Sequence, residues 1–417
     1  MKYMLVTLIP LFNENLMVAA YSMFTQKKNY FLSPELWGTG VYDGATQIEG
    51  LEIIQTMGVE TLAEDSEVFV PVGNASLFAN IQEQCDAPHE RLVLLIDDTV
   101  APEDMYVNRL RELKEDGYKL AIRKLQVAKF EEYRKILLLM DYVLLDHKKI
   151  DISKAKIYFG RIYPNIKLCA GNIEDMETFE KLKADGGYEI FEGKFFRIPI
   201  NRGEHEVSTL KVNYIQLLNM VTSEDFELTE AADVIGRDTA LVISLLKMVN
   251  RLTVNSKITS IRHAAAMLGE KELRRWLTMA VAGELYTDKP NEITRLSLLR
   301  AKFAENLAPA FSLAAQSSEL FLMGLFSVLD VILDVPMEEA LEMVKVSKPI
   351  SDALIGKKGN FALILEFIIN YESANWAEVS RLMLMNNIDM QAVYDAYLQS
   401  LQWYRDMISE SGAFAQS

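Results

Sequence analysis

The hydrophobic pattern of the sequence changes near residue 200, and this change divides the chain into two parts of different fold class. Before that point, short apolar runs alternate with segments whose apolar residues lie three and four positions apart. This alternation predicts strands connected by helices, and therefore a mainly parallel sheet that helices cover. After about residue 208 only the helical spacing continues. The second part is therefore predicted to be an all-α domain.

Eight candidate strands lie in the first half. They are Leu5–Phe12, Met17–Phe24, Glu67–Val72, Leu92–Asp97, Lys119–Lys124, Tyr142–Asp146, Lys167–Ala170 and Tyr188–Phe191. Helical spacing between them is found in Pro102–Asp116, Lys129–Met140 and Asp175–Asp185. This pattern is compatible with a small β/α barrel, whose functional side chains lie at the carboxyl ends of the strands, and also with an open sheet.

The polar stretch 201–207 (NRGEHEV) separates the two patterns, so we divide the chain into domains 1–203 and 204–417. In the second domain, helical spacing is found in Thr239–Asn250, Lys271–Leu285, Ser297–Ala310, Glu319–Leu333, Phe361–Tyr371, Trp376–Met385 and Met390–Ile408. Ser260 is a candidate N-cap of a further helix, which Gly269 is expected to end.

Charge and cysteine content argue against several functional classes. The formal net charge of −16 opposes binding to nucleic-acid phosphates or to an anionic membrane surface. Two cysteines, Cys85 and Cys169, provide neither a zinc motif nor a disulfide framework. A membrane span would need a run of about 18 apolar residues, and the sequence has none. We therefore expect a cytoplasmic protein without a metal or another cofactor.

Four segments of the first half form a recognisable set: NLMVAAYSMF, LRELKEDGYKLAIRKL, DYVLLD and CAGNIEDMETFEKLKADGGYEIFEGKFFRIP. These four segments resemble the EAL family, the barrel-shaped phosphodiesterases that open the bacterial second messenger cyclic di-GMP. The last is the most specific, because it follows the closing pattern of the family: a strand, a helix, Gln-Gly-Tyr-Phe and a proline. The resemblance covers residues 1–200 and implies an EAL-type β/α barrel.

Three segments of the second half also form a recognisable set: ADVIGRDTALVISLLKMVN, KITSIRHAAAMLGEKELRRWL and FLMGLFSVLDVILDVPMEEAL. They resemble the HDOD domain, a relative of HD-type phosphohydrolases that lacks their metal residues. Because an EAL-like barrel followed by HDOD is itself a known family, the domain order supports both assignments. The expected fold is α/β plus all-α: a degenerate EAL-type (β/α) barrel followed by an all-helical HDOD domain.

The EAL resemblance allows the metal-binding positions of active members to be compared one by one. Active members hold two divalent cations with carboxylates at the strand ends. Their Asp-Asp pair corresponds here to Arg123 and Lys124, and the other positions compared are Ser22, Leu95, Leu144, Asp146, Gly171, Glu174 and Glu192. Asp146 and Glu174 alone cannot hold two cations beside a basic pair. The sequence therefore predicts a degenerate domain that does not hydrolyse cyclic di-GMP.

The second domain also lacks the residues of a metal hydrolase. HD enzymes need an early histidine, a His-Asp pair and further ligands. Of the four histidines in the chain, only His263 lies well inside this domain, and the segment expected to hold the pair reads GLFSVLD. A single helical histidine is more often a surface or packing residue than a ligand. We therefore predict no catalytic and no metal-binding residue, and expect that the chain is not an enzyme.

A vestigial pocket remains at the barrel's strand ends, formed by Arg123, Lys124, Asp146, Glu174 and Glu192. The favoured interpretation is that the basic pair neutralises the remaining acidic side chains and fills the vacated centre. Alternatively, the pair contacts phosphates directly, with guanidinium and ammonium groups in place of metal ions.

The leading hypothesis on function is a non-catalytic signal-transduction protein, a pseudoenzyme that acts through contacts with other signalling proteins. Homo-oligomers are compatible with it. A first alternative is a metal-independent cyclic di-GMP receptor, whose binding weakens when Arg123 and Lys124 are replaced by alanine. A second is a residual phosphodiesterase, which requires Mg²⁺ or Mn²⁺ and loses activity when Asp146 or Glu174 is changed.

Overall fold

The structure is a computed structural model that describes residues 4–26, 48–197, 214, 217, 220–221, 226–236, 238–252, 258–285, 291–344 and 346–415. The chain forms two compact units. The first comprises Met1–Ile198 and Phe367–Asp395, and the second comprises Pro199–Glu366 and Ala396–Ser417. The sequence-based division at 203/204 did not anticipate that Phe367–Asp395 belongs to the first unit.

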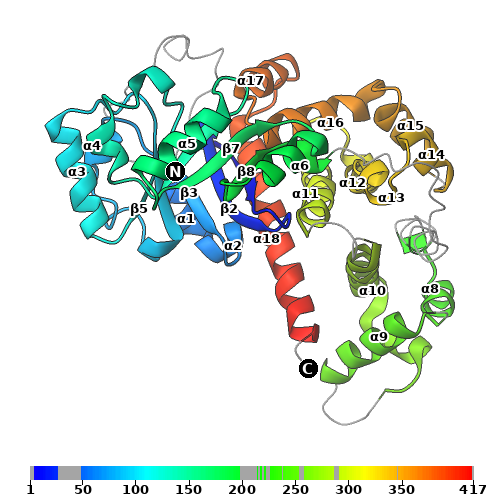
Figure 1. Cartoon of the computed structure of the whole chain (residues 1–417). Coiled ribbons are helices and arrows are strands. Elements are labelled where there is room, and N and C mark those ends of the chain that lie inside the picture. The colour runs from blue at the N-terminus through cyan, green and yellow to red at the C-terminus, as the bar shows by residue number, and fades with distance from the viewer. Residues whose placement is uncertain are drawn as a thin grey trace. The chain divides into compact units, whose positions relative to one another are not determined.

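The first unit is built around a closed eight-stranded barrel (Figure 1). Its strands are β1 (Leu5–Phe12), β2 (Val18–Gln26), β3 (Glu67–Pro71), β4 (Leu92–Ile96), β5 (Lys119–Arg123), β6 (Tyr142–Asp146), β7 (Lys167–Ile173) and β8 (Ile190–Gly193). Neighbouring strands from β2 to β8 are parallel, whereas β1 is antiparallel to both β2 and β8. The predicted strands and the barrel are confirmed. Local periodicity gave no sign that β1 runs in the opposite direction.

Apolar side chains fill the interior of the barrel, because alternate residues of each strand point inward. This buried cluster consists of Leu11, Ala20, Phe69, Val93, Leu95, Ala121, Tyr142, Leu144, Cys169 and Ile190. At Gly193 the strands come so close that an added Cβ would lie 1.9 Å from the carbonyl oxygen of Ile173. Closure between β7 and β8 therefore depends on a residue without a side chain.

Helices of the first unit surround the barrel (Figure 1). They are α1 (Leu51–Met57), α2 (Val59–Ala63), α3 (Asp104–Glu115), α4 (Arg134–Leu137), α5 (Ile152–Ile162), α6 (Met176–Asp185) and, from the late segment, α17 (Trp376–Met385). Aspartate caps begin two of them: Asp151 accepts a hydrogen bond from Lys154 N, and Asp175 accepts one from Thr178 N. The helix predicted over 129–140 is reduced to the four residues of α4.

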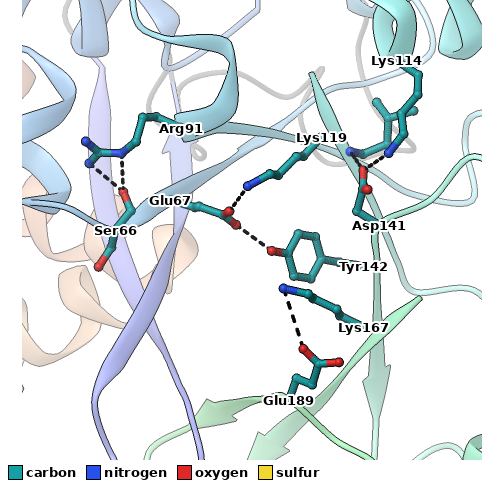
Figure 2. Close-up of polar contacts among 10 residues, drawn as sticks. Ser66, Glu67, Arg91, Lys114, Lys119, Asp141, Tyr142, Lys167 and Glu189 are labelled. Carbon is teal, nitrogen blue, oxygen red and sulfur yellow. Dashed lines mark hydrogen bonds and ion pairs between the residues drawn. The ribbon is translucent and has the colours of Figure 1, made fainter. Parts of the chain in front are cut away.

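Polar side chains gather at the amino ends of the strands (Figure 2). Glu67 begins β3, forms an ion pair with Lys119 at the start of β5, and accepts a 2.8 Å hydrogen bond from the Tyr142 hydroxyl. Next to them, Lys114 pairs with Asp141. These contacts join β3 to the non-adjacent strands β5 and β6 at the end of the barrel opposite the cavity described below, so we assign them a role in stability.

Tyr142 gives this network a measurable pH dependence. Burial, the nearby charge of Glu67 and the hydrogen bond to it raise the pKa of Tyr142 far above its ordinary value. In the unfolded chain the phenol loses its proton near pH 10, whereas in the folded barrel it keeps it. The free energy of unfolding is therefore expected to fall as pH rises above about 10, by up to about 1.4 kcal/mol per pH unit for this group. Urea unfolding at pH 8, 10 and 11 measures the slope.

The Tyr142→Phe variant should lose less stability than the wild type between pH 8 and pH 11. Its free energy of unfolding at pH 8 should be lower than that of the wild type, because the hydrogen bond to Glu67 is missing. Tyr118 and Tyr133, whose pKa values are raised to about 12 mainly by burial, keep part of the slope in the variant. Parallel curves for the two proteins would contradict the role given to Tyr142.

The second unit consists of helices, as predicted. They are α8 (Leu228–Ile235), α9 (Thr239–Leu252), α10 (Ile261–Leu285), α11 (Asn291–Leu307), α12 (Ser317–Phe326), α13 (Leu329–Leu333), α14 (Met337–Glu342) and α15 (Lys348–Leu354), with most of α16 (Gly359–Glu372) and α18 (Met390–Ala415). Within the described part of the chain, no helix is both long and apolar enough to cross a membrane.

Two sequence signals for helix ends can be compared with this unit. Ser260 caps α10, since its Oγ accepts a hydrogen bond from His263 N at 3.4 Å, and Gly269 breaks the helix with φ 74° and ψ 170°. The single helix predicted over 319–333 is instead split into α12 and α13. At the break, the Ser327 hydroxyl donates to Gly324 O, a local contact that competes with helical hydrogen bonding.

Candidate functional site

A cavity of about 1090 Å³ lies at the carboxyl ends of the barrel strands. This volume is slightly larger than the range of about 300–1,000 Å³ that is typical of small-molecule sites. The ends of β5 to β8 contribute to its wall, together with Ile9 and Phe24. All five residues of the vestigial pocket line it: Arg123, Lys124, Asp146, Glu174 and Glu192.

Arg123, the last residue of β5, lies in the mouth of the barrel. Its guanidinium carbon is 5.0 Å from the centre of the Phe24 ring, and its Nη2 is 3.4 Å from Glu192 Oε2. Only 17% of the Arg123 side chain and 18% of the Glu192 side chain are exposed. A charge-assisted hydrogen bond is normally 2.7–2.9 Å long, so Glu192 holds the guanidinium loosely. Arg123 is therefore a partly desolvated cation that can accept a second anionic partner.

Lys124 is placed differently from Arg123. Its φ of 60° lies in the left-handed region, which side-chain-bearing residues seldom adopt, and its side chain is 70% exposed. Its Nζ lies 3.7 Å from Asp97 Oδ2, beyond the end of β4. The basic pair therefore divides: Arg123 lies in the centre of the mouth and Lys124 at its rim.

The two remaining acidic positions, Asp146 and Glu174, are bound to protein groups. Asp146 Oδ1 accepts hydrogen bonds from Lys148 N at 3.0 Å and from Asn172 Nδ2 at 3.3 Å, and Lys149 Nζ lies 3.5 Å from its Oδ2. Burial acts to raise the pKa of Asp146, but these contacts outweigh it and hold the pKa below its ordinary value. Glu174 pairs with the side chain of Lys148.

The other positions compared with the EAL family give no further acidic group. Ser22 is buried in β2, and its Oγ has no hydrogen-bond partner within the described residues. Leu95 and Leu144 belong to the apolar interior. Across the described ranges there is no group of three or more His, Cys, Asp or Glu side chains that could hold a metal ion. The residues present at the mouth do not fit the pair of divalent cations that the EAL resemblance implies.

Several further charged side chains that the sequence did not single out line the same cavity: Asp98, Lys149, Lys194, Arg197 and Glu372. With the five residues already named, the wall carries as many basic as acidic side chains, although the chain as a whole has a net charge of −16. Arg197 and Glu372 form an ion pair with an N–O distance of 2.5 Å. Arg197 lies inside the closing EAL-like segment, so the sequence did contain a signal for it. Glu372 lies 175 residues later and had none.

Comparisons with known proteins agree with this architecture. Residues 207–347 match the family model of the HDOD domain. CdgJ of Vibrio cholerae, named a cyclic di-GMP phosphodiesterase, is 26% identical over 370 residues, which cover 88% of this chain and 84% of CdgJ. These matches support an EAL–HDOD two-domain architecture for the chain.

Two further proteins are similar to this chain. YuxH of Bacillus subtilis is 28% identical over 409 residues, or 96% of this chain and 97% of YuxH. The solved structure of an EAL domain protein from Listeria monocytogenes covers 47% of this chain and 87% of its own, with 17% identity and a TM-score of 0.35.

The similarity to CdgJ contradicts the prediction that the chain is not an enzyme, because that relative is named as a phosphodiesterase. The prediction is wrong because it treated the loss of individual carboxylates, such as those replaced by Arg123 and Lys124, as proof that hydrolysis is lost.

Proposed function

We propose that the chain is a cyclic di-GMP signalling protein whose barrel cavity binds the dinucleotide and that this binding needs no divalent cation. The position of Arg123 carries the proposal: a partly desolvated guanidinium at the mouth of a ligand-sized cavity, stacked on Phe24 and loosely held by Glu192. Guanidinium groups bind phosphate oxygens in pairs of hydrogen bonds, and aromatic rings stack on bases. A cyclic dinucleotide offers both groups.

The name of CdgJ supports cyclic di-GMP as the ligand, because that relative matches both parts of the chain. It also favours hydrolysis of this nucleotide as a second candidate function. Arg123 and Asp146 lie on the neighbouring strands β5 and β6 at the cavity, so a phosphate bound at Arg123 lies near a carboxylate whose pKa is low.

A calorimetric titration of the full chain with cyclic di-GMP, with and without Mg²⁺, tests the first proposal. We expect saturable binding at micromolar strength or tighter that persists in the presence of a chelator. Absence of binding under both conditions would contradict the proposal, and binding that appears only with Mg²⁺ would contradict its metal-independent form.

Chromatography of the nucleotide after incubation with Mg²⁺ or Mn²⁺ tests hydrolysis separately. Formation of the linear dinucleotide that is lost in Asp146→Asn, with binding retained, would establish the second function. An unchanged nucleotide under saturating conditions would contradict it.

A further inference from the structure

A turn from the late part of the chain completes the wall of the barrel cavity. The turn consists of Glu372, which is the last residue of α16, and of Ser373 and Ala374. The hydroxyl of Tyr371 accepts a 3.2 Å hydrogen bond from Val6 N in β1, and Tyr371 is only 1% exposed. These residues all belong to the first unit. The turn is therefore held against the barrel and forms part of the cavity wall.

A second contact anchors the helix that follows the turn. Gln26 Nε2, at the end of β2, donates to Ser380 Oγ in α17 at 3.1 Å. The turn itself is closed by backbone hydrogen bonds from Ala374 N to Tyr371 O and from Asn375 N to Asn370 O. Anchors on both sides give the side chains of the turn defined positions at the cavity.

Glu372 forms an ion pair with Arg197, a cation that could otherwise bind a phosphate group of a ligand. Its carboxylate lies 2.5 Å from the Arg197 guanidinium, and the two side chains are only 13% and 15% exposed. The Arg197 guanidinium also lies 5.1 Å from the centre of the Phe196 ring. Arginine is the residue best suited to phosphate recognition, because its fork of donors matches two oxygens at once. Glu372 and an anionic ligand therefore compete for the same donors.

Ser373, the next residue of the turn, carries a separate sign of a ligand. Its Oγ is buried and has no hydrogen-bond partner within the described residues, although Ser373 lines the cavity. Buried hydroxyl groups normally find a hydrogen-bond partner, so an unpaired one needs an explanation, and a bound ligand is one such explanation. Ser373 follows Glu372 in the sequence and lines the same cavity, so its hydroxyl is a candidate donor to an anion that displaces Glu372.

We propose that the turn Glu372–Ala374 is a built-in competitor of the cyclic dinucleotide. Glu372 holds Arg197 while the cavity is empty, and a phosphate of the ligand displaces Glu372, binds Arg197 and accepts a hydrogen bond from the Ser373 hydroxyl. This inference rests on the proposed binding of cyclic di-GMP in the barrel. It assigns control of affinity to a segment outside the EAL-like part of the sequence.

The test is a calorimetric titration of cyclic di-GMP into the full-length Glu372→Gln variant without metal. Glutamine keeps the shape of the side chain but removes the charge that competes with phosphate. We expect the dissociation constant to fall about tenfold relative to the wild type, which corresponds to about 1.4 kcal/mol. Glu378→Gln is the matched control, because Glu378 pairs with Arg381 in α17 and does not line the cavity. The affinity of this variant for cyclic di-GMP should equal that of the wild type.

The double variant Glu372→Gln/Arg197→Met separates competition from a general change of the cavity. If Glu372 acts by occupying Arg197, the gain disappears once Arg197 is removed. A gain in affinity that is retained in the double variant would contradict the proposal. If the wild type binds and Glu372→Gln binds no more tightly, the proposal is also contradicted. If neither the wild type nor Glu372→Gln binds, the proposed function fails together with this inference.

Ser373→Ala provides a second measurement that leaves the ion pair in place. It removes only the unpartnered hydroxyl, so the fold should be retained, and we expect about a threefold to tenfold loss of affinity. An affinity equal to that of the wild type would exclude the hydrogen bond assigned to Ser373. Thermal unfolding of each variant identifies a folding defect. If Glu372→Gln does not fold, the titration of Ser373→Ala still tests the role of the turn.

Discussion

Replacement of Arg123 by methionine is expected to weaken cyclic di-GMP binding by about 30- to 1000-fold, or about 2–4 kcal/mol. Methionine keeps the length of the side chain and its contact with Phe24 but removes every hydrogen-bond donor. The loss has two parts. The phosphate loses its charge-assisted hydrogen bonds, and the half-buried carboxylate of Glu192 loses its cation and then repels the ligand.

A double variant separates these two parts. Arg123→Met/Glu192→Gln removes the repulsion while the donors remain absent, so it should bind more tightly than Arg123→Met and more weakly than the wild type. Arg161→Met is the matched control, because Arg161 is exposed on α5 and does not line the cavity. Calorimetry of the four proteins measures the effect. An affinity of Arg123→Met within about twofold of the wild type would remove Arg123 from the binding site.

Replacement of Gly193 by alanine is expected to be the most destabilising single-methyl change proposed here. The added Cβ would lie 1.9 Å from Ile173 O and 2.7 Å from Ile173 N, and backbone atoms cannot rotate out of the way as a side chain can. Strands β7 and β8 must then separate locally. Such overpacking costs about 3 kcal/mol, which would lower the melting temperature of a unit of this size by about 6–12 °C.

Gly160→Ala is a control in which the same substitution is expected to increase stability. Gly160 lies in α5, and a Cβ added there has no neighbouring atom within 4 Å. The same chemical change should therefore stabilise the unit by about 0.5–1 kcal/mol through helix propensity. Circular dichroism during heating compares the two variants with the wild type. Equal melting temperatures for Gly193→Ala and the wild type would show that the contact between β7 and β8 relaxes without cost.

Local periodicity was sufficient to predict the strands of the barrel, because inward and outward residues alternate along each of them. It could not predict strand direction. β1 runs antiparallel to β2, with Ile9 opposite Ser22, and a tight turn rather than a helix connects the two strands. Helix boundaries failed where local hydrogen bonds interrupt an apolar pattern, as they do at Ser327.

The candidate site was predicted in part. The EAL resemblance identified five residues that line one cavity, among them Arg123 and Glu192, which the structure pairs. It did not predict that Lys124 lies at the rim beside Asp97, because the left-handed φ of Lys124 has no local sequence signal. No sequence motif could have identified Glu372 as part of the site, because it comes close to Arg197 only in the folded chain. Contacts with other signalling proteins and a cytoplasmic location stay predictions.

The hydrogen bond between Val6 and Tyr371 joins positions 365 residues apart, and this separation has a consequence for synthesis of the protein. At about 5–20 residues per second, a ribosome reaches Tyr371 roughly 20–70 s after Val6. During that interval the nascent barrel lacks the acceptor for Val6 N and the turn that closes its cavity wall. The barrel strands can pair early, but the ligand site is complete only when translation is almost finished.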